Sequence, residues 1–220
     1  MIQALVFDFD GLIVDTEWPE FQAWQETCQR YGVELTVETW LPCVGTGATT
    51  QVFTPYEYLA AHCEQVLDQR EVRAYCEKRH KALIGAQPVL PGVKELIVEA
   101  KQRGLGLAVA SSSPRSWVAS HLGRLELLAY FDTLACGDEV ARTKPYPDLY
   151  LTALEKIGVH PGQAIAFEDS LNGMHAAQNA GIFCVVIPNA LTKYLDLNEA
   201  NLQLTSLADI TLDELVARVG

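Results

Sequence analysis

A chain of 220 residues is long enough for one sizeable core carrying a smaller inserted domain, but too short for two full-sized domains. Hydrophobic residues make up 49% of it and charged residues 20%, a balance typical of folded globular proteins and unlike that of disordered ones. The formal net charge of −12 disfavours nucleic acid and membrane surfaces as partners, because binding to either depends on lysine and arginine. A small anionic substrate stays compatible, since it responds to a few local cations.

Residues 1–14 are strongly apolar, but their pattern is not that of a signal peptide or a membrane span. They lack a basic start and are interrupted by Asp8 and Asp10, so we interpret them as a buried strand that ends in acidic groups. The six cysteines lack the paired spacing of zinc sites or disulfide frameworks. These features predict a cytoplasmic protein with reduced cysteines.

Short apolar runs alternate with longer amphipathic stretches along most of the chain. Runs that are apolar on both faces are typical of parallel strands covered by helices on both sides. The predicted strands are residues 4–7, 105–110, 133–136, 164–167 and 183–187. A helix is predicted over residues 93–103, ended by Gly104, and Ser113 and Ser170 are predicted to cap later helices. The repeat of strand, turn and capped helix predicts an α/β fold with a doubly wound, Rossmann-like parallel sheet.

One region departs from this alternation, because no strand is predicted between residues 16 and 84. Helices are predicted there over residues 17–31, 37–41, 55–65 and 69–83. The region starts just after the acidic end of the first strand, so we interpret it as a cap that covers the strand ends as a lid. The predicted domains are an α/β catalytic core of residues 1–15 and 85–220, and a helical cap of residues 16–84.

Acidic residues follow two of the predicted strands. Asp8 and Asp10 end the first, where alternation places them on the same face, and Glu168 and Asp169 end the fourth. Carboxylates this close are stable as anions only with a cation between them or a shared proton. Ligand sites in open α/β sheets lie at the carboxyl ends of the strands. The four acids therefore predict an oxygen-rich metal site that favours Mg²⁺, with water and phosphate completing its ligands.

Hydroxyl and amine groups follow the other two strands that lead into polar residues. Ser111 and Ser112 come directly after the second strand, where a hydroxyl and free backbone N–H groups suit a phosphate oxygen, although serine before a helix is also a common cap. Lys144 lies in a segment that two prolines make rigid, which fixes its ammonium beside a phosphoryl group or a carboxylate. The four strand ends together predict phosphoryl transfer assisted by magnesium.

The same residues form four ordered motifs that resemble those of the haloacid dehalogenase superfamily. The motifs are Asp8-Phe9-Asp10-Gly11, Ala110-Ser111, Lys144-Pro145-x-Pro147-Asp148 and Phe167-Glu168-Asp169-Ser170-x-Asn172-Gly173. The helical insert and the sequence Asp15-Thr16-Glu17 are similar to the β-phosphoglucomutase-like branch of phosphatases and mutases. The resemblance covers essentially the whole chain.

The resemblance implies a role for each matched position. Asp8 is expected to be the nucleophile that forms an aspartyl-phosphate, and Asp10 the acid/base. Ser111 and Lys144 are expected to contact the phosphate. Mg²⁺ is expected to bind Asp8, the backbone carbonyl of Asp10, and Asp169, with Glu168 nearby. The spacing alone indicates that the carboxylates take part, but does not decide which one attacks.

The function predicted is Mg²⁺-dependent hydrolysis of a small phosphomonoester, such as a sugar phosphate, by a monomer. A sugar-phosphate mutase is the first alternative. The similar mutases grip a second phosphate with a cationic side chain in the cap loop, whereas residues 44–51 contain no Arg or Lys. A phospho-acceptor signalling domain is a second alternative, but such domains are shorter and lack a helical lid. Dehalogenases lack the second carboxylate, which is Asp10 here.

Overall fold

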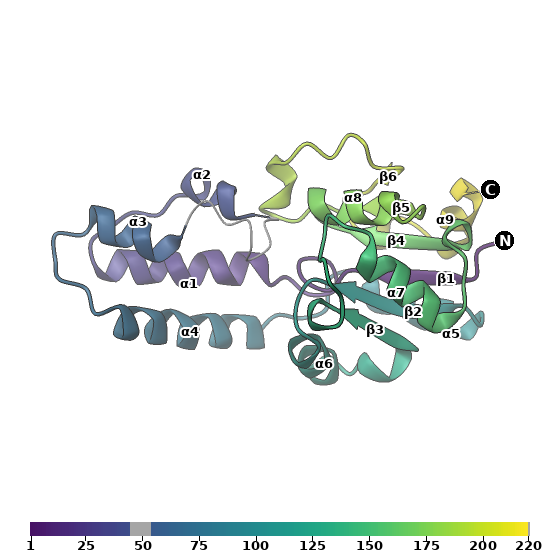
Figure 1. Cartoon of the computed structure of the whole chain (residues 1–220), viewed down its shortest axis with the longest axis horizontal. Helices are drawn as coiled ribbons and strands as arrows, with labels where there is room; N and C mark the ends of the chain where they lie inside the picture. The colour runs from purple at the N-terminus through teal and green to yellow at the C-terminus, as the bar shows by residue number, and fades with distance from the viewer. Residues whose placement is uncertain (45–53, 220) are drawn as a thin grey trace. The chain divides into compact units, whose positions relative to one another are not determined.

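A computed structural model describes residues 1–44 and 54–219 (Figure 1). The chain divides into two compact units, one of Met1–Val14 with Pro88–Gly220 and one of Asp15–Gln87. The first unit is an α/β domain, and the described residues of the second form helices joined by loops. Among the described residues, no helix has both the length and the apolar character needed to cross a membrane.

A six-stranded parallel sheet in the order β3-β2-β1-β4-β5-β6 forms the centre of the α/β unit. The strands are β1 (Ala4–Phe7), β2 (Gly106–Ser111), β3 (Thr133–Cys136), β4 (Ala164–Glu168), β5 (Phe183–Val186) and β6 (Leu202–Gln203). The doubly wound parallel sheet predicted from the sequence is confirmed. The prediction missed β6, because two residues are too few to show a strand pattern.

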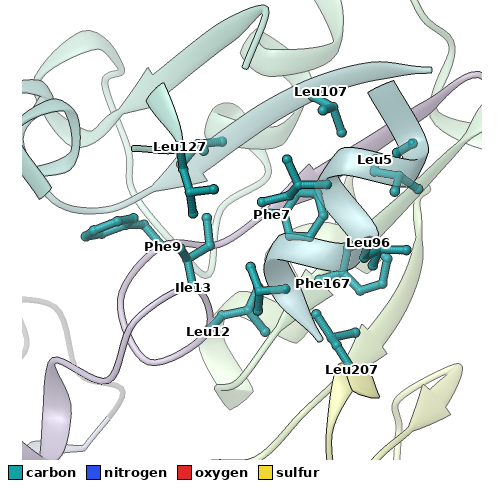
Figure 2. Packing of buried hydrophobic residues seen from close by; sticks show 14 of the residues in the cluster. Leu5, Phe7, Phe9, Leu12, Ile13, Leu96, Leu107, Leu127, Phe167 and Leu207 are labelled. Atoms are coloured by element: carbon teal, nitrogen blue, oxygen red, sulfur yellow. The ribbon is translucent and has the colours of Figure 1, made fainter. Parts of the chain in front are cut away.

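One face of the sheet carries large side chains. Leu5, Phe7, Leu107 and Phe167 are fully buried there, and the rings of Phe7 and Phe167 stack with their centroids 4.8 Å apart (Figure 2). Three helices pack on this face: α5 (Val93–Gln102), α6 (Arg115–Arg124) and α9 (Leu212–Val219). Burial of this much apolar surface is the main favourable term in the stability of the unit.

The opposite face carries small side chains, because neighbouring residues in a strand point to opposite sides. Ala4, Ala108, Ala110 and Ala166 are fully buried on it. Two helices cover this face, α7 (Asp148–Ile157) and α8 (Leu171–Asn179). Because an alanine side chain is small, the helices pack close to the sheet, and residues of α7 and α8 lie near the strand backbones.

The ends of the helices test the predicted caps. The N–H of Gly104 donates to Lys101 O as the chain leaves α5 with a φ of +75°, and the Ser170 hydroxyl accepts from the N–H of Gly173 at 3.2 Å to cap α8. The predicted Ser113 cap is wrong. Helix α6 starts after Pro114 without a side-chain cap, because the Ser113 hydroxyl donates to the Asp10 carboxylate instead.

The helical unit contains α1 (Glu17–Arg30), α2 (Val37–Trp40), α3 (Pro55–His62) and α4 (Gln69–Gly85). Helices α1 and α4 pack against each other, with Trp24, Cys28 and Val72 buried in this unit. Arg79 of α4 donates two hydrogen bonds, of 2.6 and 3.1 Å, to the carboxylate of Glu26 in α1. The helices predicted for this part of the chain are therefore present, with ends that differ by up to three residues.

The chain leaves and re-enters the α/β unit through one small pairing. Val14 forms an antiparallel bridge with Val89, and the N–H of Leu90 donates to Ile13 O at 2.9 Å. Both crossing segments are thereby fixed to each other within the α/β unit.

Two glycines around α5 provide a matched test of this packing. Both adopt a positive φ, +81° for Gly92 and +75° for Gly104, so alanine at either position costs about 1 kcal/mol of backbone strain. A Cβ at Gly92 would lie 2.2 Å from the backbone nitrogen of Ala208, whereas a Cβ at Gly104 meets nothing within 4 Å. We expect Gly92→Ala to lower the free energy of unfolding by at least about 1 kcal/mol more than Gly104→Ala in urea titrations. Equal losses would contradict this packing of α5.

Candidate active site

The carboxyl ends of β1 and β4 bring the predicted acids to the predicted lysine. Asp8 directly follows β1, and its N–H donates to Phe167 O of β4 at 2.9 Å. The Lys144 ammonium lies 2.5 Å from Asp8 Oδ1 and 2.6 Å from Glu168 Oε1. Asp8 and Glu168 are buried, and the side chain of Lys144 is only 7% exposed. One buried ammonium therefore serves two buried carboxylates.

The charges in this group alter the proton affinity of its members. Burial raises the pKa of Asp8 from 3.8 to about 8, and the negative charge of Glu168 adds to the rise, although Lys144 opposes it. Burial by itself lowers the pKa of Lys144, but the carboxylates of Asp8 and Glu168 outweigh burial and raise it above its ordinary value. A single ammonium does not balance two carboxylates, so the site favours a further positive charge.

Glu168 is held from the sheet, from α7 and from α8. The Tyr150 hydroxyl of α7 donates to its Oε1, while its Oε2 is buried without a hydrogen-bond partner among the described residues. A Cβ at Gly173 would lie 1.8 Å from Oε2, so only glycine fits at this position of α8. The glycine of the fourth motif thus makes room for the buried carboxylate.

Carboxylate oxygens of Asp8, Glu168 and Asp169 lie within 4.8 Å of one another, and all three residues are buried. Asp169 Oδ2 accepts a hydrogen bond of 2.7 Å from Asn189, which follows β5. A site of carboxylate oxygens with an unpaired buried acceptor and an excess of negative charge suits a hard divalent cation. The residues present therefore fit the magnesium ion that the sequence predicts.

The Asp10 carboxylate has a separate set of partners. Its Oδ2 accepts from Ser113 Oγ at 2.7 Å and from Ser111 Oγ at 3.3 Å, and its Oδ1 accepts from Trp117 Nε1 at 2.9 Å. Gly11, with a φ of +83°, turns the chain here, and a Cβ on it would lie 2.2 Å from Asp169 Oδ2. The Asp10 carboxylate thus has hydrogen-bond partners of its own, while its charge still helps to raise the pKa of Asp8.

Ser111 and Ser112 differ in their surroundings. Ser111 ends β2, is 1% exposed, and its Oγ accepts from the N–H of Ser113 at 3.1 Å. Ser112 is exposed, and a Cβ at Gly137 would lie 2.1 Å from its carbonyl oxygen. The structure therefore joins Ser111 to the site through Asp10, whereas Ser112 has an exposed side chain and a carbonyl that lies close to Gly137.

Four residues around the site were not assigned these contacts from the sequence. The Tyr150 hydroxyl donates to Glu168, the Asn189 amide to Asp169, and the Trp117 indole to Asp10. Ser113, which the sequence predicted to be a helix cap, also donates to Asp10. Ser113 and Asn189 follow β2 and β5, so the rule that polar residues at strand ends form the site could have found both, whereas Tyr150 and Trp117 lie within helices.

Comparison with known proteins places this site in a family. The family model for haloacid dehalogenase-like hydrolases matches residues 5–187, which include all the clustered acids. The chain belongs to the haloacid dehalogenase-like hydrolases. This confirms the resemblance stated from the four motifs.

Relatives within the haloacid dehalogenase-like hydrolases match almost the whole chain. A candidate phosphatase of Bacillus subtilis, YhcW, is 38% identical over 96% of this chain and 95% of its own length. A protein of Thermotoga maritima named phosphorylated carbohydrates phosphatase is 33% identical over 82% of both chains. The crystal structure of a candidate β-phosphoglucomutase from Thermotoga maritima aligns with a TM-score of 0.81, at 29% identity, covering 98% of this chain and 99% of its own. The β-phosphoglucomutase-like branch is thereby supported.

Lys144 and Lys156 allow a buried ion pair to be compared with an exposed one. Lys144→Met leaves the buried Asp8 and Glu168 without their ammonium, so we expect the free energy of unfolding to fall by about 3–5 kcal/mol. Lys156 pairs with Glu139 at 3.3 Å while its side chain is 34% exposed, so Lys156→Met should cost about 1 kcal/mol or less. Urea denaturation near pH 7 measures both, and a Lys144→Met loss as small as that of Lys156→Met would contradict the buried ion pair.

Proposed function

We propose that the protein is a Mg²⁺-dependent phosphatase that hydrolyses a small phosphomonoester, a sugar phosphate or a related metabolite, through an aspartyl-phosphate on Asp8. The observation that carries the proposal is a buried Asp8 beside one ammonium and two further acids, with a second carboxylate, Asp10, on its own hydrogen bonds. The names of relatives agree, since the Thermotoga maritima protein is called a phosphatase of phosphorylated carbohydrates.

The nucleophilic step uses Asp8. Its carboxylate attacks phosphorus, an O–P bond forms on Asp8, and the bond from phosphorus to the leaving oxygen breaks. Lys144 lies beside Asp8, so its ammonium is placed to offset the negative charge of the transferring phosphoryl oxygens. Ser111 and Ser112 are proposed to contact the same phosphate. Mg²⁺, held by Asp8, Asp169 and the Asp10 carbonyl with Glu168 nearby, would favour the ionised form of Asp8 and reduce its repulsion from phosphate.

Asp10 is proposed to move the protons. Its carboxyl gives a proton to the leaving oxygen in the first step and takes one from water in the second. Water then attacks phosphorus, the Asp8–phosphorus bond breaks, and inorganic phosphate leaves with Asp8 regenerated. The separate hydrogen bonds of Asp10 suit a role that differs from that of Asp8.

The leaving group is proposed to be selected by the helical cap of residues 16–84, with residues 1–15 and 85–220 as the catalytic core, in a monomeric cytoplasmic enzyme. Hydrolysis is favoured over mutase activity because residues 44–51 contain no lysine or arginine to hold a second phosphate. Of that loop, residues 45–51 lie outside the described residues.

Replacing the nucleophile tests the aspartyl-phosphate. We expect Asp8→Asn to abolish phosphate release from a panel of sugar phosphates and other phosphomonoesters, because the amide is nearly isosteric but cannot attack. Phosphate release is measured by a colorimetric assay and folding by circular dichroism. Asp209→Asn, an exposed change in the same unit, should keep the wild-type rate. Substantial turnover by Asp8→Asn would refute the mechanism. If the wild type formed an isomerised sugar phosphate without releasing phosphate, the mutase would be favoured instead.

Metal addition tests the acidic cluster by a second readout. We expect chelation to stop turnover and Mg²⁺ to restore it, and Mg²⁺ to raise the melting temperature of the wild type, because a ligand that binds the folded state stabilises it. At about 100 times the dissociation constant, the gain is about 2.7 kcal/mol. Asp169→Asn should lose most of the melting shift, whereas Asp196→Asn, which is exposed, should keep it. Metal-independent turnover would show that the cluster has another role.

A further inference from the structure

The three hydrogen bonds to Asp10 are not equivalent in what they allow. An indole N–H can only donate, so Asp10 Oδ1, which faces Trp117 Nε1 at 2.9 Å, must accept and cannot carry a proton on that side. A hydroxyl can donate or accept, so Ser111 and Ser113 fit Oδ2 in either state. The network therefore makes Oδ1 an acceptor only, and leaves Oδ2 as the oxygen beside groups that can either donate or accept.

The indole itself is held in place by its neighbours. Trp117 lies in the first turn of α6, where its backbone N–H donates to Pro114 O at 3.0 Å. Its ring packs on the ring of His121, one turn further along the helix, with the centroids 4.3 Å apart. The His121 ring lies 6.2 Å from that of Phe9, the neighbour of Asp10 in the chain. Helix α6 thus presents a fixed donor to Asp10 from a part of the chain that none of the four motifs includes.

We propose that Trp117 is a positioning residue for proton transfer, acting through Asp10. The indole N–H orients the carboxyl so that Oδ2, beside Ser111 and Ser113, delivers the proton to the leaving oxygen and later receives one from water. The inference rests on the proposed phosphatase function and assigns that function a residue outside the motifs. It concerns which oxygen carries the proton in each step.

The leaving group provides a test that a merely structural role would not pass. An alkyl phosphate, such as a sugar phosphate, has a poor leaving group that needs a proton, whereas 4-nitrophenyl phosphate releases a stable phenolate without one. The ratio kcat/KM reports events up to transfer of phosphorus to Asp8, and kcat also includes hydrolysis of the aspartyl-phosphate, which needs Asp10 as a base for both substrates. Loss of orientation at Asp10 therefore affects the two substrates differently.

The variant to compare with the wild type is Trp117→Phe, which removes the indole N–H and keeps an aromatic ring beside His121. We expect kcat/KM for a sugar phosphate to fall about 10- to 100-fold, part of the full effect of general acid catalysis, and kcat/KM for 4-nitrophenyl phosphate to change less than about 3-fold. For 4-nitrophenyl phosphate, kcat should fall and a burst of phenolate should appear, because hydrolysis of the aspartyl-phosphate becomes slow.

Two further variants separate the hydrogen bond from the fold. Trp117→Gln returns an N–H donor without the ring, and its sugar-phosphate kcat/KM should exceed that of Trp117→Phe. Ser116→Ala, an exposed change beside Trp117, should match the wild type with both substrates. Thermal melting followed by circular dichroism checks each variant, and if Trp117→Phe does not fold, Trp117→Met, which also lacks the N–H donor, replaces it with both substrates.

Each outcome either supports or overturns the inference. A selective loss with the sugar phosphate supports it. Equal losses with both substrates would assign Trp117 a structural role, and unchanged or faster turnover of the sugar phosphate would show that the indole does not help Asp10. In both of those cases an active wild type leaves the proposed function intact. A wild type that releases phosphate from neither substrate would overturn the proposed function and the inference with it.

Discussion

The buried contact of Lys144 with Asp8 and Glu168 is the constraint on which the rest of the site depends. Carboxylates at the ends of two neighbouring parallel strands cannot remain ionised inside a protein without a counter-charge. The ammonium supplies one charge, and the remaining excess of negative charge makes the same place attractive to a divalent cation. The folded chain therefore presents a cluster of carboxylates whose charge and oxygen ligands fit a divalent cation.

The two faces of the sheet contribute differently to this arrangement. The face with large side chains supplies most of the buried apolar area and fixes α5, α6 and α9. The face lined by alanines brings α7 and α8 close enough for Tyr150 to reach the carboxylate of Glu168, and for Gly173 to leave space for it. Packing on one side thus provides stability, while close approach on the other provides the geometry of the acids.

Much of this could be predicted from the sequence, because strands, helix ends, the strand-end positions of Asp8 and Glu168, and the proline-bounded loop of Lys144 are encoded in short patterns. The strand-end rule also explains why these groups meet in space. Contacts made by single side chains from helices carry no such pattern: Trp117 and Tyr150 follow the ordinary periodicity of α6 and α7. Ser113 shows most clearly what the sequence cannot distinguish. A serine before a helix has the same sequence pattern whether its hydroxyl caps the helix or donates to Asp10.

The pairing of Val14 with Val89 has an evolutionary meaning. Because the two ends of the insert are fastened together inside the α/β unit, the entropy of closing this long excursion is offset by contacts that do not involve the insert itself. The sheet can therefore tolerate an excursion of different length or sequence at this point. A lineage with this architecture is free to exchange the inserted segment while inheriting the α/β unit and its acidic cluster unchanged.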